Sequence, residues 1–580
     1  MSSYLNVSSS ATGRQWIGPS IEDERQGMAI AQATGMPELM GIILAKRGVT
    51  PNEAEGYLKP SMRELMPDPS SMRDMDKATE RFLAAVKAKQ KIAIFADYDV
   101  DGGSSAALLI IWLRAFNITP TLYIPDRIIE GYGPNNEAMA QLGETHDLII
   151  TVDCGTVSHE PIAAAKCDVI VLDHHLGGET LPDAIAVVNP NRQDETGDLG
   201  YLCAAGVVFM MLAAANRSLR EAGETGPDLM SMLDLVALAT VADVAPLIGF
   251  NRALVRQGLT VMARRDRVGL VALSDVAKVN SAPSAYHLGY ILGPRVNAGG
   301  RIGAPDIGAR LLATNDPAEA AALAERLDFL NTERRDIEAT VLAQASEQAE
   351  QRGTSRGLVW AAGDGWHPGV VGIVASRLKE AYNRPAVVIG LDGGEGKGSG
   401  RSINGVDLGN AISALTRDGL LLKGGGHKMA AGLTVATGKL DEAMERLTEL
   451  LEKQGAANAG PADLRIDGLI TTAGATVELI EMLEAAGPFG ASSLAPRFAL
   501  ASARISFAKR AGENHLRLTL TDGAGSKLDA IAFRAFDTDL GPMLEKHGGK
   551  AFHFAGRLEI DEWGGRRKAK LKLEDAAPAT

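Results

Sequence analysis

Short apolar runs alternate with Ala- and Leu-rich stretches from Lys91 onward. The runs KIAIF, DLIITV and DVIVL are rich in Ile and Val, whereas GGSSAALLIIWLRAF and SHEPIAAAK carry their apolar residues at helical spacing. Buried strands that alternate with helices are typical of βαβ units around a parallel sheet. The pattern therefore predicts an α/β domain, with polar residues placed at the carboxyl ends of its strands.

The same pattern divides the rest of the chain. A run with leucines at helical spacing and dense charge elsewhere predicts a long connector helix. A second α/β region follows it, and short alternating runs after a Gly/Ala/Pro-rich linker predict a small β-barrel. The expected units are an N-terminal extension (1–80), a first α/β domain (81–315), the connector helix (316–352), a second α/β domain (353–455) and the barrel (464–575).

Composition narrows the class of protein. The 580 residues include 59 Lys+Arg, 72 Asp+Glu and only 3 Cys, for a net charge of -13. Three cysteines without CxxC spacing indicate neither a disulfide framework nor a structural zinc, so a reducing cytoplasm fits best. The polar N-terminus lacks the apolar core of a signal peptide. The most apolar helical stretch, 204–215, is too short to cross a bilayer, so no membrane partner is expected.

Carboxylates and histidines follow the predicted strands. They are Asp97, Asp99, Asp101, Asp153, Asp173, His174 and His175, with Asp243 in a later helical stretch. A single aspartate after a strand is usually a helix cap or turn residue, and an adjacent His pair is more often surface or core. Three such clusters in one α/β unit instead predict sites for two divalent cations, Mn²⁺ or Mg²⁺. Two such ions suit hydrolysis of a phosphodiester or phosphoanhydride.

Other polar residues stand where a nucleic-acid backbone could bind. Ser399 and Arg401 lie in a glycine-rich segment that is no Walker A loop, and His427 follows three glycines. The segment could equally be a tight turn with a solvated arginine. Arg127 and Tyr132 share one loop, where a tyrosine more often packs than stacks on a base. A further glycine-rich loop, 289–303, carries two more candidates, Arg295 and Arg301.

Several motifs together carry a family resemblance. ADYDVDG, TVDCG, LDHH and ATVADVAPL resemble the successive motifs of the DHH phosphoesterase superfamily, and GKGSGRS with GGGHKMAAG resembles its DHHA1 domain. VVNPN, GPRVNAGGR and GWHPGVVGIVASRLKE resemble the RecJ family of single-stranded-DNA exonucleases. The resemblance covers residues 80–575 and implies a DHH domain, a DHHA1 domain and a C-terminal OB-fold.

The resemblance also implies roles for single residues. Asp99, Asp101, Asp153, His174 and Asp243 would be metal ligands, with Asp97, Asp173 and His175 completing the centre. The catalytic residues would be Asp99, Asp101, Asp153, His174 and His175. Phe95 stands where some relatives carry a histidine, which weakens the case for an extra ligand. Ser399, Arg401 and His427 would bind a terminal 5′-phosphate, and Arg127, Tyr132, Arg295 and Arg301 would contact the strand.

The implied activity is 5′→3′ hydrolysis of single-stranded DNA to 5′-mononucleotides, in recombination and repair. Cooperation with a helicase and a single-strand-binding protein is expected, with a monomeric chain as the default. Two alternatives remain open. One is a small-substrate enzyme that cleaves pyrophosphate, cyclic dinucleotides or very short RNA, and the other is a non-catalytic scaffold in a replication assembly. Relatives of the first kind are shorter and lack the barrel, and the intact carboxylates argue against the second.

Overall fold

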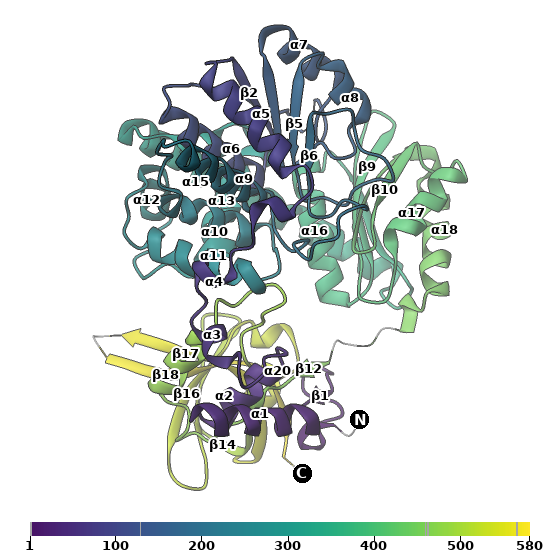
Figure 1. Ribbon diagram of the computed structural model, residues 1–580. Coiled ribbons are helices and arrows are strands. Elements are labelled where there is room, and N and C mark those ends of the chain that lie inside the picture. Colours follow the sequence, from purple (N-terminus) through teal and green to yellow (C-terminus); the bar gives the residue numbers. More distant parts are fainter. Residues whose placement is uncertain (1–2, 128, 459, 461–462, 564–565, 580) are drawn as a thin grey trace.

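The computed structural model describes residues 3–127, 129–458, 460, 463–563 and 566–579. Two α/β domains lie side by side in the upper part of the molecule, and a β-barrel with the N-terminal helices lies below them (Figure 1). The fold class predicted from the sequence is confirmed: a parallel sheet, a mixed sheet, a long helix between them and a C-terminal barrel.

The first domain is built on a five-stranded parallel sheet of order β3-β2-β4-β5-β6. Its strands are β2 (Ile92–Ala96), β3 (Thr121–Tyr123), β4 (Leu148–Val152), β5 (Asp168–Leu172) and β6 (Ala186–Val188). Ile92 and Ile94 face a core with helices α5 (Met75–Lys87) and α6 (Val100–Arg114). Ala93 and Phe95 face the other core, with α7 (Asn136–Thr145) and α8 (His159–Ala164). Both faces are covered, as expected for a parallel sheet.

A helical part completes this domain. It comprises α9 (Ala204–Glu221), α10 (Leu233–Ala242), α11 (Gly249–Met262), α12 (Val268–Val276), the π-helical segment η4 (His287–Leu292), α13 (Gly293–Ile302) and α14 (Ile307–Ala313). The glycine-rich loop predicted at 289–303 is wrong, because this segment is helical. Its glycines permit close packing instead: a Cβ on Gly300 would lie 2.7 Å from the side chain of Tyr98.

Helix α15 (Pro317–Arg352) joins the two α/β domains. It begins where the side chain of Asp316 accepts a hydrogen bond from the backbone N–H of Ala318, with a proline at the first helical position. Leu327 and Leu330 are buried in the core of the first domain, whereas Val341 is buried against the second. One helix thus packs into both cores, which fixes the domains relative to each other.

The second α/β domain has a mixed sheet of order β10-β11-β9-β8-β7, in which only β7 and β8 are parallel. Its strands are β7 (Val359–Asp364), β8 (Ala386–Asp392), β9 (Glu395–Arg401), β10 (Lys423–His427) and β11 (Ala430–Ala436). Helix α16 (Pro368–Tyr382) packs between the sheet and α15, and α17 (Leu408–Arg417) and α18 (Leu440–Lys453) cover the other face. Helix α16 therefore lies on the side of the first domain.

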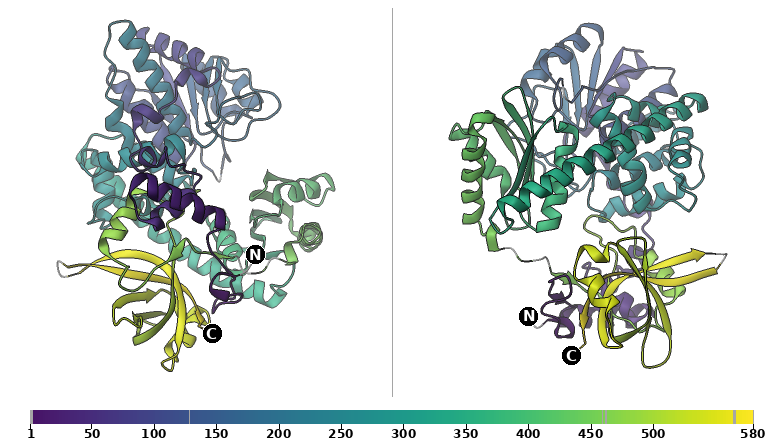
Figure 2. Two further views of the ribbon diagram at one scale, coloured as in Figure 1. Left: turned by 60° about the horizontal axis from the view of Figure 1, so that its bottom comes forward. Right: turned by 180° about the vertical axis from the view of Figure 1, so that it is seen from behind.

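The barrel closes through pairing of its first long strand with its fourth. Its strands are β14 (Phe498–Ala511), β15 (His515–Thr521), β16 (Lys527–Ala532), β17 (Ala551–Trp563) and β18 (Arg566–Pro578), joined at one edge by β13 (Gly468–Leu469). Helices α19 (Val477–Ala485) and α20 (Leu540–Glu545) pack on it. The hairpin β17–β18 projects beyond the barrel wall (Figure 2).

The N-terminal extension belongs to both halves of the molecule. Strand β1 (Trp16–Ile17) pairs with β12 (Leu464–Arg465), and α1 (Ile21–Thr34) and α2 (Glu38–Ala45) share one apolar core with the barrel. The short helices α3 (Ala54–Leu58) and α4 (Met62–Leu65) then lead to α5 in the first domain. The sequence assigned no role to this extension, and the structure shows that its first half completes the barrel. Among the described residues, no helix is both long enough and apolar enough to span a bilayer.

Candidate metal centre and substrate cleft

The carboxyl ends of three neighbouring strands bring the predicted carboxylates together. Asp97, Asp153 and Asp173 directly follow β2, β4 and β5, which are adjacent in the sheet. Asp153 has a φ of 62°, a left-handed conformation that is uncommon outside glycine and is often found at functional sites. Position 102 accepts only glycine, since a Cβ there would lie 2.3 Å from the carbonyl oxygen of Asp97.

The potential ligand atoms form three overlapping groups. Within each group the atoms lie within 4.8 Å of one another, and the groups are Asp153 with His174 and His175, Asp101 with His174 and Asp243, and Asp97 with Asp99 and Asp153. His174 lies at the centre: its Nε2 is 3.2 Å from Oδ1 of Asp153, 3.6 Å from Oδ2 of Asp101 and 3.7 Å from Oδ2 of Asp243. Asp243 follows α10, so the helical part of the domain closes the cluster.

Backbone groups orient two of these carboxylates. The two side-chain oxygens of Asp101 accept hydrogen bonds of 2.7 and 2.8 Å from the N–H groups of Ala204 and Ala205, at the start of α9. A helix N-terminus favours negative charge, so this buried carboxylate is held in place. Asp99 caps α6, where its Oδ1 accepts from the N–H groups of Asp101 and Gly102.

The cluster concentrates negative charge in a buried place. Burial, and then the neighbouring Asp99, raises the pKa of Asp97 well above its ordinary value, and burial with Asp101 does the same for Asp153. Burial and Asp101 raise the pKa of Asp243 to about 9. Oδ1 of Asp97 is buried and has no hydrogen-bond partner among the described residues. Carboxylate and imidazole donors with unmet negative charge fit divalent cations such as Mn²⁺ or Mg²⁺.

Asp173 lies beside these groups but belongs to none of the three. Its Oδ1 accepts hydrogen bonds from the N–H groups of His174 and His175 and lies 2.8 Å from Nδ1 of His175, and its Oδ2 accepts from the N–H of Thr156. Burial alone would lower the pKa of His175, but the contact with Asp173 outweighs it and raises this pKa to about 9. Asp173 thus orients the imidazole of His175. That Asp173 also binds a metal stays a prediction.

Three further residues shape the centre. The hydroxyl of Tyr132 donates to the carbonyl oxygen of Asp153 (3.2 Å) and lies 3.1 Å from Nε2 of His175. Asn189 and Asn191 donate from their amides to the carbonyl oxygens of His175 and His174. Sequence reasoning gave the two asparagines no role, although their Asn-Pro-Asn turn directly after an apolar run could have marked them.

Basic side chains gather where the two α/β domains meet. Arg301 of α13, with Arg401 of β9, lines a cavity of about 220 Å³ beside Gly372 and Ser376 of α16. Nη1 of Arg401 donates to Oγ of Ser399 at 3.0 Å. Burial, and then the positive charge of Arg127, lowers the pKa of both Arg301 and Arg401.

Arg127 lies between this basic group and the carboxylates. Its guanidinium lies 5.2 Å from the ring centre of Tyr98, which is flanked by Asp97 and Asp99, and its charge counteracts the rise in the pKa of Asp97. Its charge also contributes to the lowered pKa of His367, which caps α16. The charge of Arg127 therefore acts both on a carboxylate of the cluster and on Arg401 of the second domain, so the carboxylates and the basic side chains lie close to each other at the domain junction.

Two of the predicted substrate contacts lie apart from this cavity. Arg295 donates from Nε to Asp328 of α15 (2.8 Å) and from Nη1 to the carbonyl oxygen of Ile291, so it joins α13 to α15. His427 is exposed at the end of β10 and is not among the residues that line the cavity. Their assignment as substrate contacts stays a prediction.

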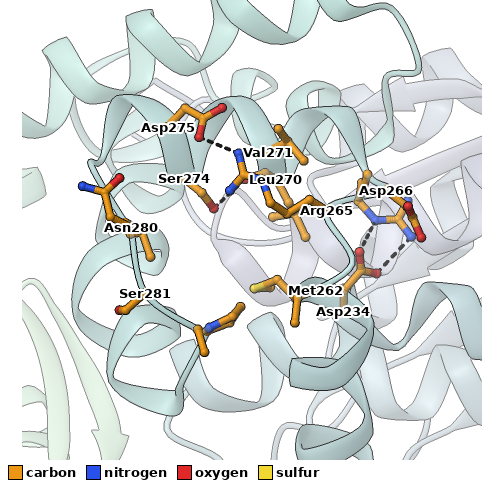
Figure 3. A pocket seen from close by; sticks show the side chains of 15 residues that line it. Asp234, Met262, Arg265, Asp266, Leu270, Val271, Ser274, Asp275, Asn280 and Ser281 are labelled. Atoms are coloured by element: carbon orange, nitrogen blue, oxygen red, sulfur yellow. Dashed lines mark hydrogen bonds and ion pairs between the residues drawn. The ribbon is translucent and has the colours of Figure 1, made fainter. Parts of the chain in front are cut away.

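A further cavity of about 420 Å³ lies in the helical part of the first domain (Figure 3). Its charged walls are largely paired internally: Arg267 binds Asp234, and Arg265 binds Asp275. Asp234 is at the start of α10 and Asp243 just beyond its end, about 14 Å apart along the helix axis. This cavity is therefore separate from the carboxylate centre.

Comparison with known families agrees with the architecture. A profile described as the DHH family, N-terminal domain, matches residues 91–240, a DHHA1 domain profile matches 354–453, and a RecJ OB domain profile matches 466–575. The fold and the carboxylate centre thus define a DHH/DHHA1 phosphoesterase-type protein with an OB barrel. The relatives described next are more specific, and they show that the chain belongs to the RecJ family.

The similarity extends over nearly the whole chain. The single-stranded-DNA-specific exonuclease RecJ of Dickeya dadantii is 38% identical over 94% of this chain and 96% of its own length, and that of Escherichia coli is 35% identical over the same shares. The crystal structure of RecJ from Thermus thermophilus in complex with Mn²⁺ superposes with a TM-score of 0.81 at 28% identity, covering 97% of this chain and 79% of that one. A Mg²⁺ complex of the same protein has a TM-score of 0.74.

Proposed function

We propose that this protein is a single-stranded-DNA-specific exonuclease that hydrolyses phosphodiester bonds with two divalent cations. The observation that carries the proposal is the pairing of a buried carboxylate and histidine cluster with a basic cavity across the junction of two domains. The near full-length similarity to exonucleases, barrel included, favours a polymer substrate over pyrophosphate or a cyclic dinucleotide. The structures of a relative with Mn²⁺ and with Mg²⁺ support either ion.

The proposed metal-binding residues are Asp97, Asp99, Asp101, Asp153, His174 and Asp243. When bound, two such cations supply a water of lowered pKa and neutralise charge on the reacting phosphate. The chain's own contribution is geometric. Asp101 is fixed by α9, His174 is held by the hydrogen bond that its carbonyl accepts from Asn191, and His175 is oriented by Asp173. Asp173 favours the charged form of His175, in which both ring nitrogens carry a proton.

The basic cavity accounts for the proposed polarity. Ser399, Arg401 and Arg127 offer a hydroxyl and two guanidinium groups, which suit a terminal phosphate dianion. A 5′-phosphate held there would place the next phosphodiester at a fixed distance from the carboxylates. Each cut would then release one 5′-mononucleotide and create a new 5′-phosphate, so hydrolysis would proceed 5′→3′. His427 and Arg295 remain proposed contacts of the strand.

The wider setting is part of the same proposal. A 5′→3′ exonuclease specific for single strands fits DNA recombination and repair in the cytoplasm of a bacterium. A helicase would supply its substrate, and a single-strand-binding protein would cover it. We propose that the chain acts as a monomer, since both walls of the cleft come from one chain.

An exonuclease time course with Mn²⁺ or Mg²⁺ tests the reaction. The substrates are a 5′-phosphorylated single strand, the matched duplex, a short oligoribonucleotide and pyrophosphate. We expect stepwise release of 5′-mononucleotides from the single-stranded DNA alone. Asp153→Ala should lower kcat by at least about 100-fold, because losses in the outer shell of a metal site already cost 10–100-fold. Cleavage of pyrophosphate or of short oligoribonucleotides alone would favour a small-substrate enzyme. Binding of the single strand without hydrolysis would favour a scaffold.

The phosphate pocket has its own test. Arg401→Ala should raise KM about tenfold or more for a 5′-phosphorylated strand, because one hydrogen bond to a charged group is lost, and should matter little for a 5′-hydroxyl strand. Arg377→Ala is the matched control: Arg377 lines the same cavity, but it is more than half exposed and pairs with Glu338. An equal rise in KM for both strands would show that Arg401 does not bind the 5′-phosphate.

A further inference from the structure

Two tyrosines, Tyr286 directly before η4 and Tyr290 within it, present their rings to solvent. Tyr286 is 58% exposed and Tyr290 is 73% exposed, yet their rings stack on each other at a centroid distance of 5.2 Å and an interplanar angle of 26°. Two large aromatic side chains that stay in water contribute no hydrophobic stabilisation to the fold. A paired and exposed arrangement therefore indicates a contact surface. We call these two rings the tyrosine pair.

The tyrosine pair is fixed beside the carboxylate centre. Gly289, next to Tyr290, lies so close to α10 that a Cβ would be 3.3 Å from the side chain of Val241, and a Cβ on Gly293 would be 3.0 Å from Ala242. Asp243 follows Ala242, directly after the end of α10, and its carboxylate belongs to the cluster. The two glycines therefore let η4 approach the end of the helix that presents a proposed metal ligand.

The backbone on both sides of this contact is unusual. Segment η4 is π-helical over His287–Leu292, a geometry that occurs mostly as short insertions at functional sites. Val244 has a φ of 60°, which is costly for a β-branched residue, and its side chain is 69% exposed. Strain of this kind persists only where the surroundings enforce it. Here it presents an apolar side chain directly after Asp243.

An arginine links the segment of the tyrosine pair to α15, which carries a further exposed aromatic ring. Arg295 donates to the carbonyl oxygen of Ile291, next to Tyr290, and to Asp328. Phe329, the residue after Asp328, is 54% exposed and has the guanidinium of Arg326 at 5.3 Å from its ring centre. Aromatic rings with an interleaved arginine are the combination that binds single strands without sequence preference.

We propose that the tyrosine pair is a base-stacking platform for the part of the strand that lies 3′ of the scissile phosphodiester. The proposal rests on the proposed nuclease function and names a binding site for nucleobases in the first α/β domain. A base cannot enter between the two rings, because intercalation needs about 7 Å, twice the base rise of 3.4 Å. The open face of Tyr290 is the one that receives a base. In a duplex the base faces are already stacked, so the platform selects single strands.

An abasic scan tests the platform on the full-length protein with Mn²⁺. A single tetrahydrofuran residue is placed at successive positions from the 5′ end of a 5′-phosphorylated strand, and KM and kcat are measured for each. In the wild type we expect a KM increase of roughly 5- to 150-fold at one or two adjacent positions, the range typical of lost base–aromatic stacking. Tyr286→Ala/Tyr290→Ala should raise KM for the intact strand and abolish this position dependence.

Ring-preserving and ring-removing substitutions separate stacking from packing. Tyr290→Phe keeps the aromatic face and should retain the wild-type KM, whereas Tyr290→Leu should resemble the alanine variant. If Tyr290→Leu binds the intact strand as well as Tyr290→Phe does, the platform is wrong. Unchanged Mn²⁺ stoichiometry and thermal unfolding in these variants exclude loss of the fold as the cause.

A binding measurement keeps the platform distinct from the nuclease proposal. The strand carries 2-aminopurine at successive positions from the 5′ end, one position per strand, and its fluorescence is followed on an Asp153→Ala background, which needs no hydrolysis. Quenching that disappears with Tyr290→Leu supports the platform whether or not the wild type cleaves DNA. Absence of quenching at every position overturns it, even if the exonuclease activity is present.

Discussion

At the scale of single residues, the carboxylate cluster should make stability depend on pH and metal. The folded-state pKa of Asp243 is raised to about 9, and those of Asp97 and Asp153 are raised as well, against about 4 in an unfolded chain. Without metal, the stability that these groups contribute is present below pH 4 and is lost as pH rises through the folded-state pKa values. Mn²⁺ replaces the competing protons, so it should raise the melting temperature by about 2 °C or more, and more at pH 8.5 than at pH 6.

Asp153→Asn provides the control for this behaviour. The substitution removes one negative charge from the cluster, so the metal-free variant should melt above the metal-free wild type at pH 8.5. It also removes a proposed metal ligand, so the variant should gain little stability from Mn²⁺. Differential scanning calorimetry with and without Mn²⁺ measures both effects. If the metal-free variant is less stable than the metal-free wild type, repulsion between the carboxylates is not what lowers the stability of the metal-free protein.

The residues of this cluster differ in how far the sequence could predict them. Asp97, Asp153 and Asp173 could be placed at one sheet edge, because strand ends follow from the local apolar pattern. The partners of Asp173 could not, because its hydrogen bond from Thr156 comes from another strand end. Asn189 and Asn191 were missed because they act through carbonyl oxygens of the His pair, which no local pattern reveals.

At the scale of elements, the N-terminal strand should stabilise the barrel through one buried contact. Nε1 of Trp16 donates to Oδ2 of Asp575 at 3.0 Å, and both residues are fully buried. Trp16→Phe leaves that carboxylate oxygen without its donor, which should lower the free energy of unfolding by about 1–3 kcal/mol in urea titrations. Trp16→Phe/Asp575→Leu removes both polar groups and should recover part of the loss. If the double variant is as unstable as the sum of the single ones, the hydrogen bond is not the cause.

The secondary-structure elements could be predicted from the sequence, but the packing partner of the N-terminal helices could not. Strands and helices of both α/β domains and of the barrel were predicted, since each carries its own periodicity, and that architecture is confirmed. The place of the first 60 residues was not predicted. Their apolar residues, such as Ile30 and Leu44, pack on barrel residues such as Phe498, more than 450 positions later in the chain. Periodicity shows that a helix has an apolar face but not which distant surface covers it.

At the scale of the whole molecule, two arginines of α11 hold the first domain against the barrel and the extension that completes it. Arg252 of α11 donates to the carbonyl oxygens of Tyr57, Ala486 and Gly487, and its guanidinium lies 3.7 Å from the ring centre of Tyr57. Arg256 donates to Leu58 and Ala485, and Arg47 donates to Ala486. The carbonyls of Ala485, Ala486 and Gly487 end or follow α19, and those of Tyr57 and Leu58 end α3. The C-terminal end of a helix favours positive charge. We call this contact the arginine joint.

Loosening the arginine joint should affect long substrates alone. Arg252→Met keeps the apolar stem but removes every donor, so the barrel would no longer be held at a fixed position relative to the cleft. If the barrel binds the 3′ part of a strand, its contribution depends on that fixed position, as for two linked binding modules. We expect KM for a strand of about 20 nucleotides to rise about tenfold or more, with kcat and the KM of a trinucleotide unchanged. Arg264→Ala, an exposed arginine just after the same helix, is the control. An equal rise for both lengths would mean that the joint acts on the cleft itself and not through the barrel.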